Sequence, residues 1–153
     1  MNVVAVISTW FLAAVFLFAG IDKAFHYDGF VNALRSYALI PELLAAPLAP
    51  AVILVELWVG LGLLLRSWRQ RAALTGAAVL GVFTLALAVN QWVAPGSICG
   101  CWFTVTLAQS SGMHIVQNLV LFGLSLTVWW QMRSGGLSDG STRIVHEASS
   151  ASI

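Results

Sequence analysis

The stretch AALTGAAVLGVFTLALAVNQWV, residues 72–93, decides the fold of this chain. It contains no charged side chain along its whole length. A helix of about 20 apolar residues covers the roughly 30 Å of hydrocarbon in a bilayer. An arginine-rich link precedes the stretch and Pro95-Gly96 ends it. We therefore interpret residues 72–93 as a membrane-spanning helix.

Three further apolar segments have a similar length, at about residues 3–20, 48–65 and 113–131. The chain is 59% hydrophobic and 8% charged, whereas soluble domains carry about 25% charged residues. A water-soluble fold of 153 residues cannot hide so much apolar surface. The net charge of +1, without a basic run, gives no sign of nucleic-acid binding. The sequence predicts an all-α integral membrane protein, with a four-transmembrane-helix bundle over residues 1–133.

The segments outside the spans have patterns of their own. Phe30, Leu34 and Tyr37 recur at helical spacing between spans one and two, which predicts a short interfacial helix there. Pro47 and Pro50 fall at the expected start of span two, where proline costs least. Residues 134–153 are rich in Ser and Gly, so we expect a flexible cytoplasmic tail.

The basic residues predict the orientation. The link between spans two and three and the segment after span four carry five of them: Arg66, Arg69, Arg71, Arg133 and Arg143. The first link carries two, Lys23 and Arg35, and the third link carries none. Basic residues favour the cytoplasmic side of a membrane. We therefore expect both termini in the cytoplasm, with the first and third links outside.

Small residues recur at four-residue spacing in span three, at Ala73, Ala77 and Gly81. Such residues let the backbones of neighbouring helices approach closely in a membrane. We interpret this pattern as packing within the bundle. A face for homo-oligomer formation is the less favoured alternative.

Glu56 is an acidic residue inside an apolar span, and Lys23 follows span one on the same side. A carboxylate at this depth is costly unless it is paired, protonated or hydrated. A Glu–Lys pair that fixes the helix register is one interpretation. A proton relay or a ligand contact is the other, and the sequence leaves both open.

A group of polar residues opens span four. His114, Gln117 and Asn118 lie three and four residues apart, so they share one helical face. Asn90 and Gln91 lie at a similar depth near the end of span three. Hydrogen bonds between helices are the simplest explanation for the amides. The imidazole of His114 can change charge near neutral pH and stabilise a nearby thiolate.

Cys99 and Cys101 lie in the third link, separated by Gly100. A disulfide across so short a span is strained, and strained disulfides are reduced more readily. On an oxidising side of the membrane the pair can undergo thiol–disulfide exchange. Two alternatives remain open. The cysteines can be structural, or two thiolates with His114 or Met113 can hold Cu(I) or zinc, although such a ligand set is small.

Four motifs resemble the methylamine-utilisation MauE family, within the DoxX-like group of four-span membrane proteins. The resemblance covers roughly Trp10 to Trp130 and rests on Phe18-Ala19-Gly20-Ile21-Asp22-Lys23, Phe30 to Pro41, Glu56 with Gly60, and Cys99-Gly100-Cys101-Trp102-Phe103. The family usually shows Cys-Gly-Cys-Phe-Gly at the last position. The residues Trp102-Phe103-Thr104 depart from that pattern.

The resemblance implies a role in disulfide formation or maturation of an extracytoplasmic enzyme, in the bacterial cytoplasmic membrane, with a thioredoxin-like partner. The DoxX-like relatives imply redox chemistry near a quinone. The candidate function is a thiol–disulfide oxidoreductase, with these catalytic residues: Cys99, Cys101 and His114. The candidate cofactor-binding residues are Lys23, Glu56, Gln117 and Asn118. The alternative function is a non-catalytic accessory subunit of a larger membrane or respiratory complex.

Overall fold

The computed structural model describes residues 3–37, 39–93 and 111–150, and the side-chain surroundings within these ranges except at 111–113 and 134–150. The described residues form helices and no strands: α1 Val3–Phe25, α2 Tyr27–Arg35, α3 Glu42–Leu64, α4 Arg69–Val93 and α5 Ser111–Ser150. Three of these helices, and the part His114–Arg133 of α5, are long and apolar enough to cross a membrane. The prediction of four transmembrane helices with a short helix after the first is confirmed.

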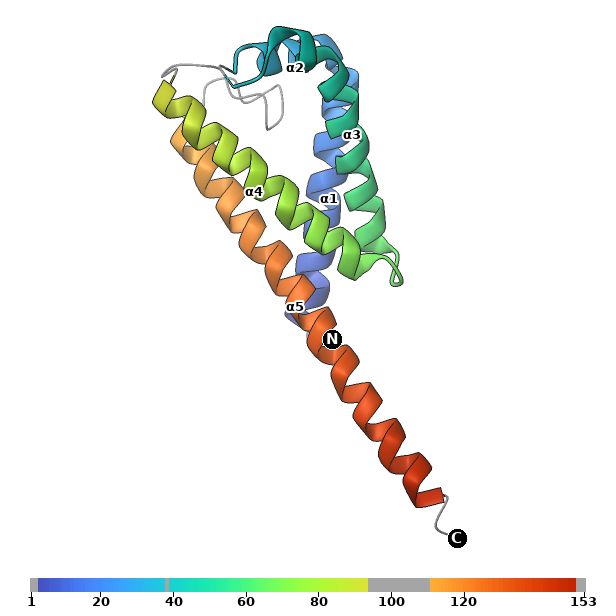
Figure 1. Ribbon diagram of the computed structural model, residues 1–153. Helices are drawn as coiled ribbons and strands as arrows, with labels where there is room; N and C mark the ends of the chain where they lie inside the picture. Colours follow the sequence, from blue (N-terminus) through green and yellow to red (C-terminus); the bar gives the residue numbers. More distant parts are fainter. Residues whose placement is uncertain (1–2, 38, 94–110, 151–153) are drawn as a thin grey trace.

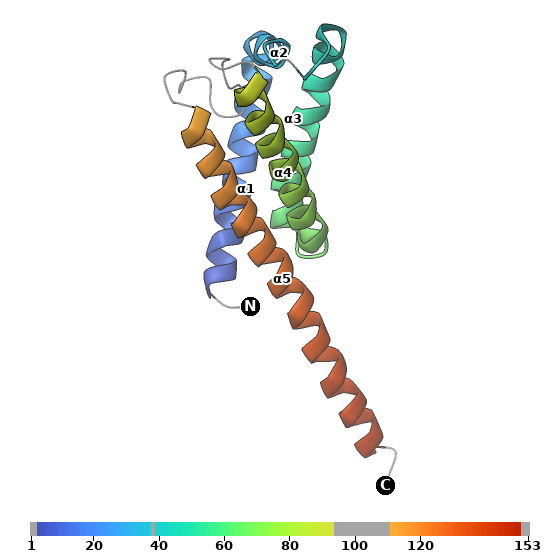
Figure 2. The same cartoon turned by 60° about the vertical axis from the view of Figure 1, so that its left-hand side comes forward.

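The four long helices pack as two pairs. Helix α1 packs along α3, and α4 packs along α5 (Figure 1). The pairs meet near the link between α3 and α4 and diverge toward α2, which lies across the opposite end (Figures 1 and 2). We call these the arginine end, after Arg66 and Arg69, and the α2 end. Helix α4 ends and α5 begins at the α2 end (Figure 1).

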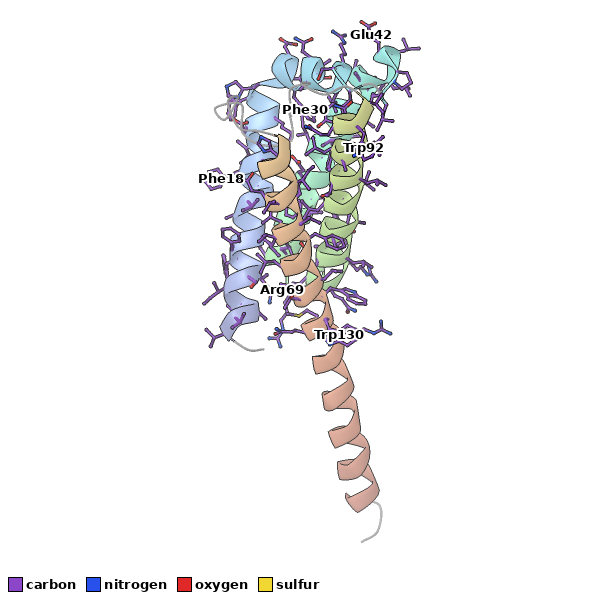
Figure 3. All side chains as sticks on the ribbon, turned by 90° about the vertical axis from the view of Figure 1, so that its left-hand side faces the viewer. Phe18, Phe30, Glu42, Arg69, Trp92 and Trp130 are labelled. Atoms are coloured by element: carbon purple, nitrogen blue, oxygen red, sulfur yellow. The ribbon has the colours of Figure 1, made fainter. Side chains whose placement is uncertain are left out.

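Large apolar side chains cover the outside of the bundle. Phe18, Trp92 and Trp130 are 63%, 91% and 65% exposed. Trp92 lies toward the α2 end and Trp130 toward the arginine end (Figure 3). Tryptophan is enriched where a protein crosses the two interfaces of a bilayer. With four spanning helices, this surface is that of a multi-pass membrane protein.

Helix α3 begins earlier than the sequence predicts. The expected start was at about residue 48, but the helix begins at Glu42, so Pro47 and Pro50 lie inside it. A proline at position 50 cannot donate to the carbonyl of Ala46, one turn before it. The hydroxyl of Tyr27 donates to that carbonyl instead, at 3.1 Å. A side chain from α2 thus satisfies the backbone group that the proline frees.

Replacing Tyr27 with Phe is expected to destabilise the protein by about 1 kcal/mol, because the Ala46 carbonyl loses its donor. The measurement is thermal unfolding of the purified protein in detergent. In a Pro50→Ala background the new backbone N–H can donate to Ala46, so the same substitution should cost less. An equal cost in both backgrounds would show that the hydroxyl does not compensate for the proline.

The small residues of α4 are used within the chain. Ala73 and Ala77 are 1% and 2% exposed. A Cβ atom added at Gly76 would lie 3.1 Å from Val59 of α3 and 3.2 Å from Phe16 of α1. Gly81 faces Phe122 of α5. This confirms that the small-residue pattern serves packing within the bundle.

Helix α5 continues past the membrane span to Ser150. Its last part projects away from the bundle beyond the arginine end (Figure 1). A helix can continue in this way because its backbone hydrogen bonds are local. The sequence predicted a flexible cytoplasmic tail over 134–153, and the flexibility and location of that segment stay predictions.

Candidate functional site

A buried ion pair joins α1 to α3. The Nζ atom of Lys23 lies 2.9 Å from Oε1 and 3.0 Å from Oε2 of Glu56. The two residues are only 3% and 6% exposed. An isolated charge in such surroundings is very costly, and a second charge with well-placed hydrogen bonds offsets that cost. The structure thus brings together the two charged residues that the sequence singled out.

Two glycines let the helices approach closely enough to form this pair. Gly20 lies three residues before Lys23 on α1, and Gly60 lies four residues after Glu56 on α3. A Cβ atom at Gly60 would lie 2.7 Å from the side chain of Leu17. One at Gly20 would lie 3.0 Å from the side chain of Leu57. Because α1 and α3 run in opposite directions, both glycines lie on the arginine-end side of the pair, where they hold the two helices close together.

Helix α2 covers the ion pair. The ring of Phe30 is almost fully buried, and its centroid lies 5.6 Å from the Lys23 Nζ atom. An ammonium group has three donors. The two carboxylate oxygens accept from it, and the aromatic ring provides a further favourable contact. A ligand can reach Glu56 only if this arrangement opens, so the geometry favours the register interpretation.

A Gly60→Ala variant is expected to lose about 1–3 kcal/mol of stability, because the added methyl group must push α1 away from α3. The free energy of unfolding is measured by titrating the protein in detergent with a denaturing surfactant. Gly123→Ala is the matched control, since a Cβ atom there meets no atom within 4 Å. The control should be neutral or slightly stabilising, because alanine favours helix. Equal stability of the two variants would contradict the close α1–α3 contact.

A second polar group lies at the α2 end of α5. His114 and Asn118 are each 3% exposed. Gln117, which lies between them in the sequence, is half-buried. Asn90, near the end of α4, is also buried. Within the part of the chain that the structure describes, His114 Nδ1 and Gln117 Oε1 have no hydrogen-bond partner. Such buried atoms are rare and mark places where a further polar group can bind.

The two cysteines lie outside the described residues, as does the whole of 94–110. The described residues on either side of that link are Val93 and Ser111, and both lie at the α2 end (Figure 1). His114 lies within one helical turn of Ser111. The predicted Cys99, Cys101 and His114 arrangement, and the alternative metal site on the same thiolates, therefore stay predictions.

Sequence reasoning missed Tyr27 and the role of Gly20. Pro50 has no backbone N–H, so the carbonyl of Ala46 needs a donor from elsewhere, and this need was the sequence signal that pointed to a residue such as Tyr27. The signal for Gly20 was its spacing of one turn from Lys23 on the same helical face. Neither signal identifies the partner residue, because the contact joins segments far apart in the sequence.

Residues 1–131 match the family model described as methylamine utilisation protein MauE. A methylamine utilization protein MauE of Methylophilus methylotrophus is 36% identical over 127 residues, covering 82% of this chain and 67% of the relative. That of Paracoccus denitrificans is 30% identical over 147 residues, covering 94% of this chain and 79% of the relative. No solved structure matches the chain.

Proposed function

Because the chain belongs to the MauE family of methylamine utilisation proteins, we propose that it is a membrane thiol–disulfide redox module. Cys99 and Cys101 are the reacting pair in this proposal. It supports disulfide formation or maturation of an extracytoplasmic enzyme, together with a thioredoxin-like partner. The observation that carries it is the Cys-Gly-Cys sequence in a link whose two flanking helices meet at the α2 end.

The proposed exchange has two steps. A thiolate of the partner attacks one sulfur of the Cys99–Cys101 disulfide, so that the bond breaks and a mixed disulfide forms. The second thiol of the partner then attacks that mixed disulfide and releases the pair as two thiols. Two electrons and two protons move from this partner to the pair. For disulfide formation the partner in these steps is the client enzyme, and the disulfide of the thioredoxin-like protein then reoxidises the pair by the reverse sequence and becomes a dithiol.

His114 is the proposed positioning residue for this exchange. Its buried Nδ1 atom has no partner among the described residues, and a histidine beside a thiol favours the thiolate. Gln117 has a buried oxygen on the neighbouring part of the helix. In this proposal, these two atoms are the polar groups of α5 that are available for hydrogen bonds during the exchange.

The proposal places the α2 end outside the bacterial cytoplasmic membrane. The arginine end, with Arg66, Arg69 and Arg71, then faces the cytoplasm together with both termini. The separation of the two ends in the structure supports this arrangement, because positively charged links remain on the cytoplasmic side.

Two of the four residues predicted for a quinone, Lys23 and Glu56, are paired with each other, whereas the carbonyl oxygens of a quinone need hydrogen-bond donors. Lys23 donates to both oxygens of Glu56. The unpaired atom of Gln117 is an oxygen, which cannot donate, whereas the buried amide of Asn118 carries a donor. Quinone binding stays a prediction, and the electron transfer proposed here runs between protein thiols and disulfides.

Trapping of mixed disulfides tests the function. A Cys101→Ser or Cys99→Ser variant, expressed with the native methylamine-utilisation proteins, should hold a partner that reductant releases. Mass spectrometry identifies that partner, expected to be thioredoxin-like or the client enzyme. The matched control is the double Cys99→Ser and Cys101→Ser variant, which should hold none. Equal amounts of adduct in the control, or none in either single variant, would contradict the proposal.

Small residues on an outer face of α4 would support the accessory-subunit alternative. Ala73 and Ala77 are instead buried within this chain, and Gly81 is half-buried beside Phe122. Stable co-purification with large membrane subunits, and full function without the cysteines, would favour that alternative.

A further inference from the structure

An apolar cleft separates α3 from α4 below α2. Its upper part has a volume of about 210 Å³ and is roofed by Phe30, Leu34 and Tyr37. Its lower part, of about 340 Å³, lies between Val52 of α3 and Val79 of α4. The two parts share three lining residues, Leu48, Val82 and Phe83. The backbones of α3 and α4 diverge toward the α2 end (Figure 1), and residues of both helices line the cleft.

Carbon atoms line almost the whole cleft. A buried water needs two to four polar partners, and an apolar cavity does not provide them. Val82 and Leu48, which line it, are 67% and 40% exposed on the lipid-facing side of the spanning helices. The opening of the cleft therefore faces the hydrocarbon of the bilayer. A hydrocarbon chain that enters sideways between α3 and α4 matches this lining and this opening.

The roof of the cleft carries an exposed positive charge. Arg35 lies next to the lining residue Leu34 in α2, and its guanidinium contacts only the side chain of Asn32, at 3.4 Å, within the described chain. No carboxylate among the described residues forms an ion pair with Arg35. A helix at the membrane surface places such a group at the level of the lipid phosphates. The charge thus complements an anionic headgroup above the cleft.

We propose that the cleft binds one acyl chain of an anionic bilayer phospholipid, whose phosphate lies against Arg35. The proposal is independent of the thiol chemistry. Phe30 connects the site to the ion pair, because its ring lines the cleft and also contacts Lys23. A bound chain packs against Phe30, so the lipid stabilises the position of α2 over the buried charges.

Native mass spectrometry of the delipidated protein tests the site, with phosphatidylglycerol and phosphatidylcholine as probes. We expect one phosphatidylglycerol per chain, bound about fivefold more tightly than phosphatidylcholine, the factor that one basic residue near a lipid surface supplies. Ala86 lines the cleft, and an Ala86→Trp variant should lose the bound lipid. Ala14 of α1 is lipid-exposed and outside the cleft, so Ala14→Trp is the matched control and should keep it.

An Arg35→Gln variant provides a second test that leaves the core unchanged. It should still bind both lipids, but with equal affinity. Equal lipid retention by the two tryptophan variants would overturn the proposal, as would an unchanged preference for phosphatidylglycerol in Arg35→Gln. Displacement of the lipid by a long-chain benzoquinone would identify a quinone as the occupant instead. A dimer that only Ala86→Trp disrupts would identify a second copy of the chain.

Discussion

Replacing Lys23 with Met is expected to cost about 3–5 kcal/mol of stability, because the substitution leaves Glu56 as an unpaired buried charge. Glu56 is 6% exposed, and both of its carboxylate oxygens accept from the Lys23 ammonium group. Loss of the pair also removes the contact between the charge and Phe30. The measurement is the unfolding of purified protein in detergent, together with the yield of folded protein in the membrane.

A double variant separates the pair from the individual charges. Lys23→Met combined with Glu56→Leu removes both charges, and replacing a buried ion pair with apolar residues is often neutral or stabilising. The double variant should therefore recover most of the stability that Lys23→Met loses. If the double variant is as unstable as the single one, helix packing rather than charge compensation explains the loss.

The same variants decide between the two interpretations of the pair. If the pair only fixes the register of α1 against α3, the stable double variant should still support methylamine-dependent growth. If the pair is a proton relay or a ligand contact, the double variant should fold but should not support this growth. The closed geometry around Lys23, Glu56 and Phe30 favours the first result.

Replacing Cys99 and Cys101 with Ser is expected to abolish the proposed function, because a hydroxyl cannot form or exchange a disulfide. Methylamine-dependent growth and the disulfide content of the mature client enzyme should both fall to the level of a deletion strain. Serine is close to cysteine in size and neither residue lies within the described spanning helices, so we expect folding and membrane insertion to be unchanged. Growth equal to that of the wild type would exclude thiol chemistry by this chain.

A His114→Gln variant tests whether His114 acts in the exchange or only in the local structure. Glutamine keeps a polar side chain at this buried position but cannot carry the positive charge of an imidazolium group. The rate of thiol exchange should fall and its pH dependence should shift toward that of an ordinary thiol. A variant that loses stability but keeps the original pH profile would limit His114 to a structural role.

The apolar runs predict much of the fold. Spans of about 20 residues, such as 72–93, have one stable arrangement in a bilayer, a helix with its backbone groups paired internally. The short helix α2 follows from the spacing of Phe30 and Leu34, although Tyr37 of the same pattern lies beyond its end at Arg35. The start of α3 does not follow from hydropathy, because Tyr27 compensates for Pro50 through a contact between two helices.

The sequence identifies the residues of the candidate site, but it does not identify all the contacts between them. Lys23 and Glu56 stand out because charge inside an apolar span is costly, and the structure pairs them. The cover formed by Phe30 depends on how α2 lies across the bundle, which spacing alone does not determine. The cleft between α3 and α4 depends on the angle between two helix pairs, and no sequence period encodes that angle (Figure 1).

The central claim is that the thiols react outside the cytoplasm. The direct measurement is labelling of Cys99 and Cys101 in intact spheroplasts, after mild reduction, with a membrane-impermeant maleimide. The account predicts a mass shift of two labels in intact spheroplasts, and no more after permeabilisation. Labelling that occurs only after permeabilisation would place the sulfur atoms on the arginine side and contradict the account.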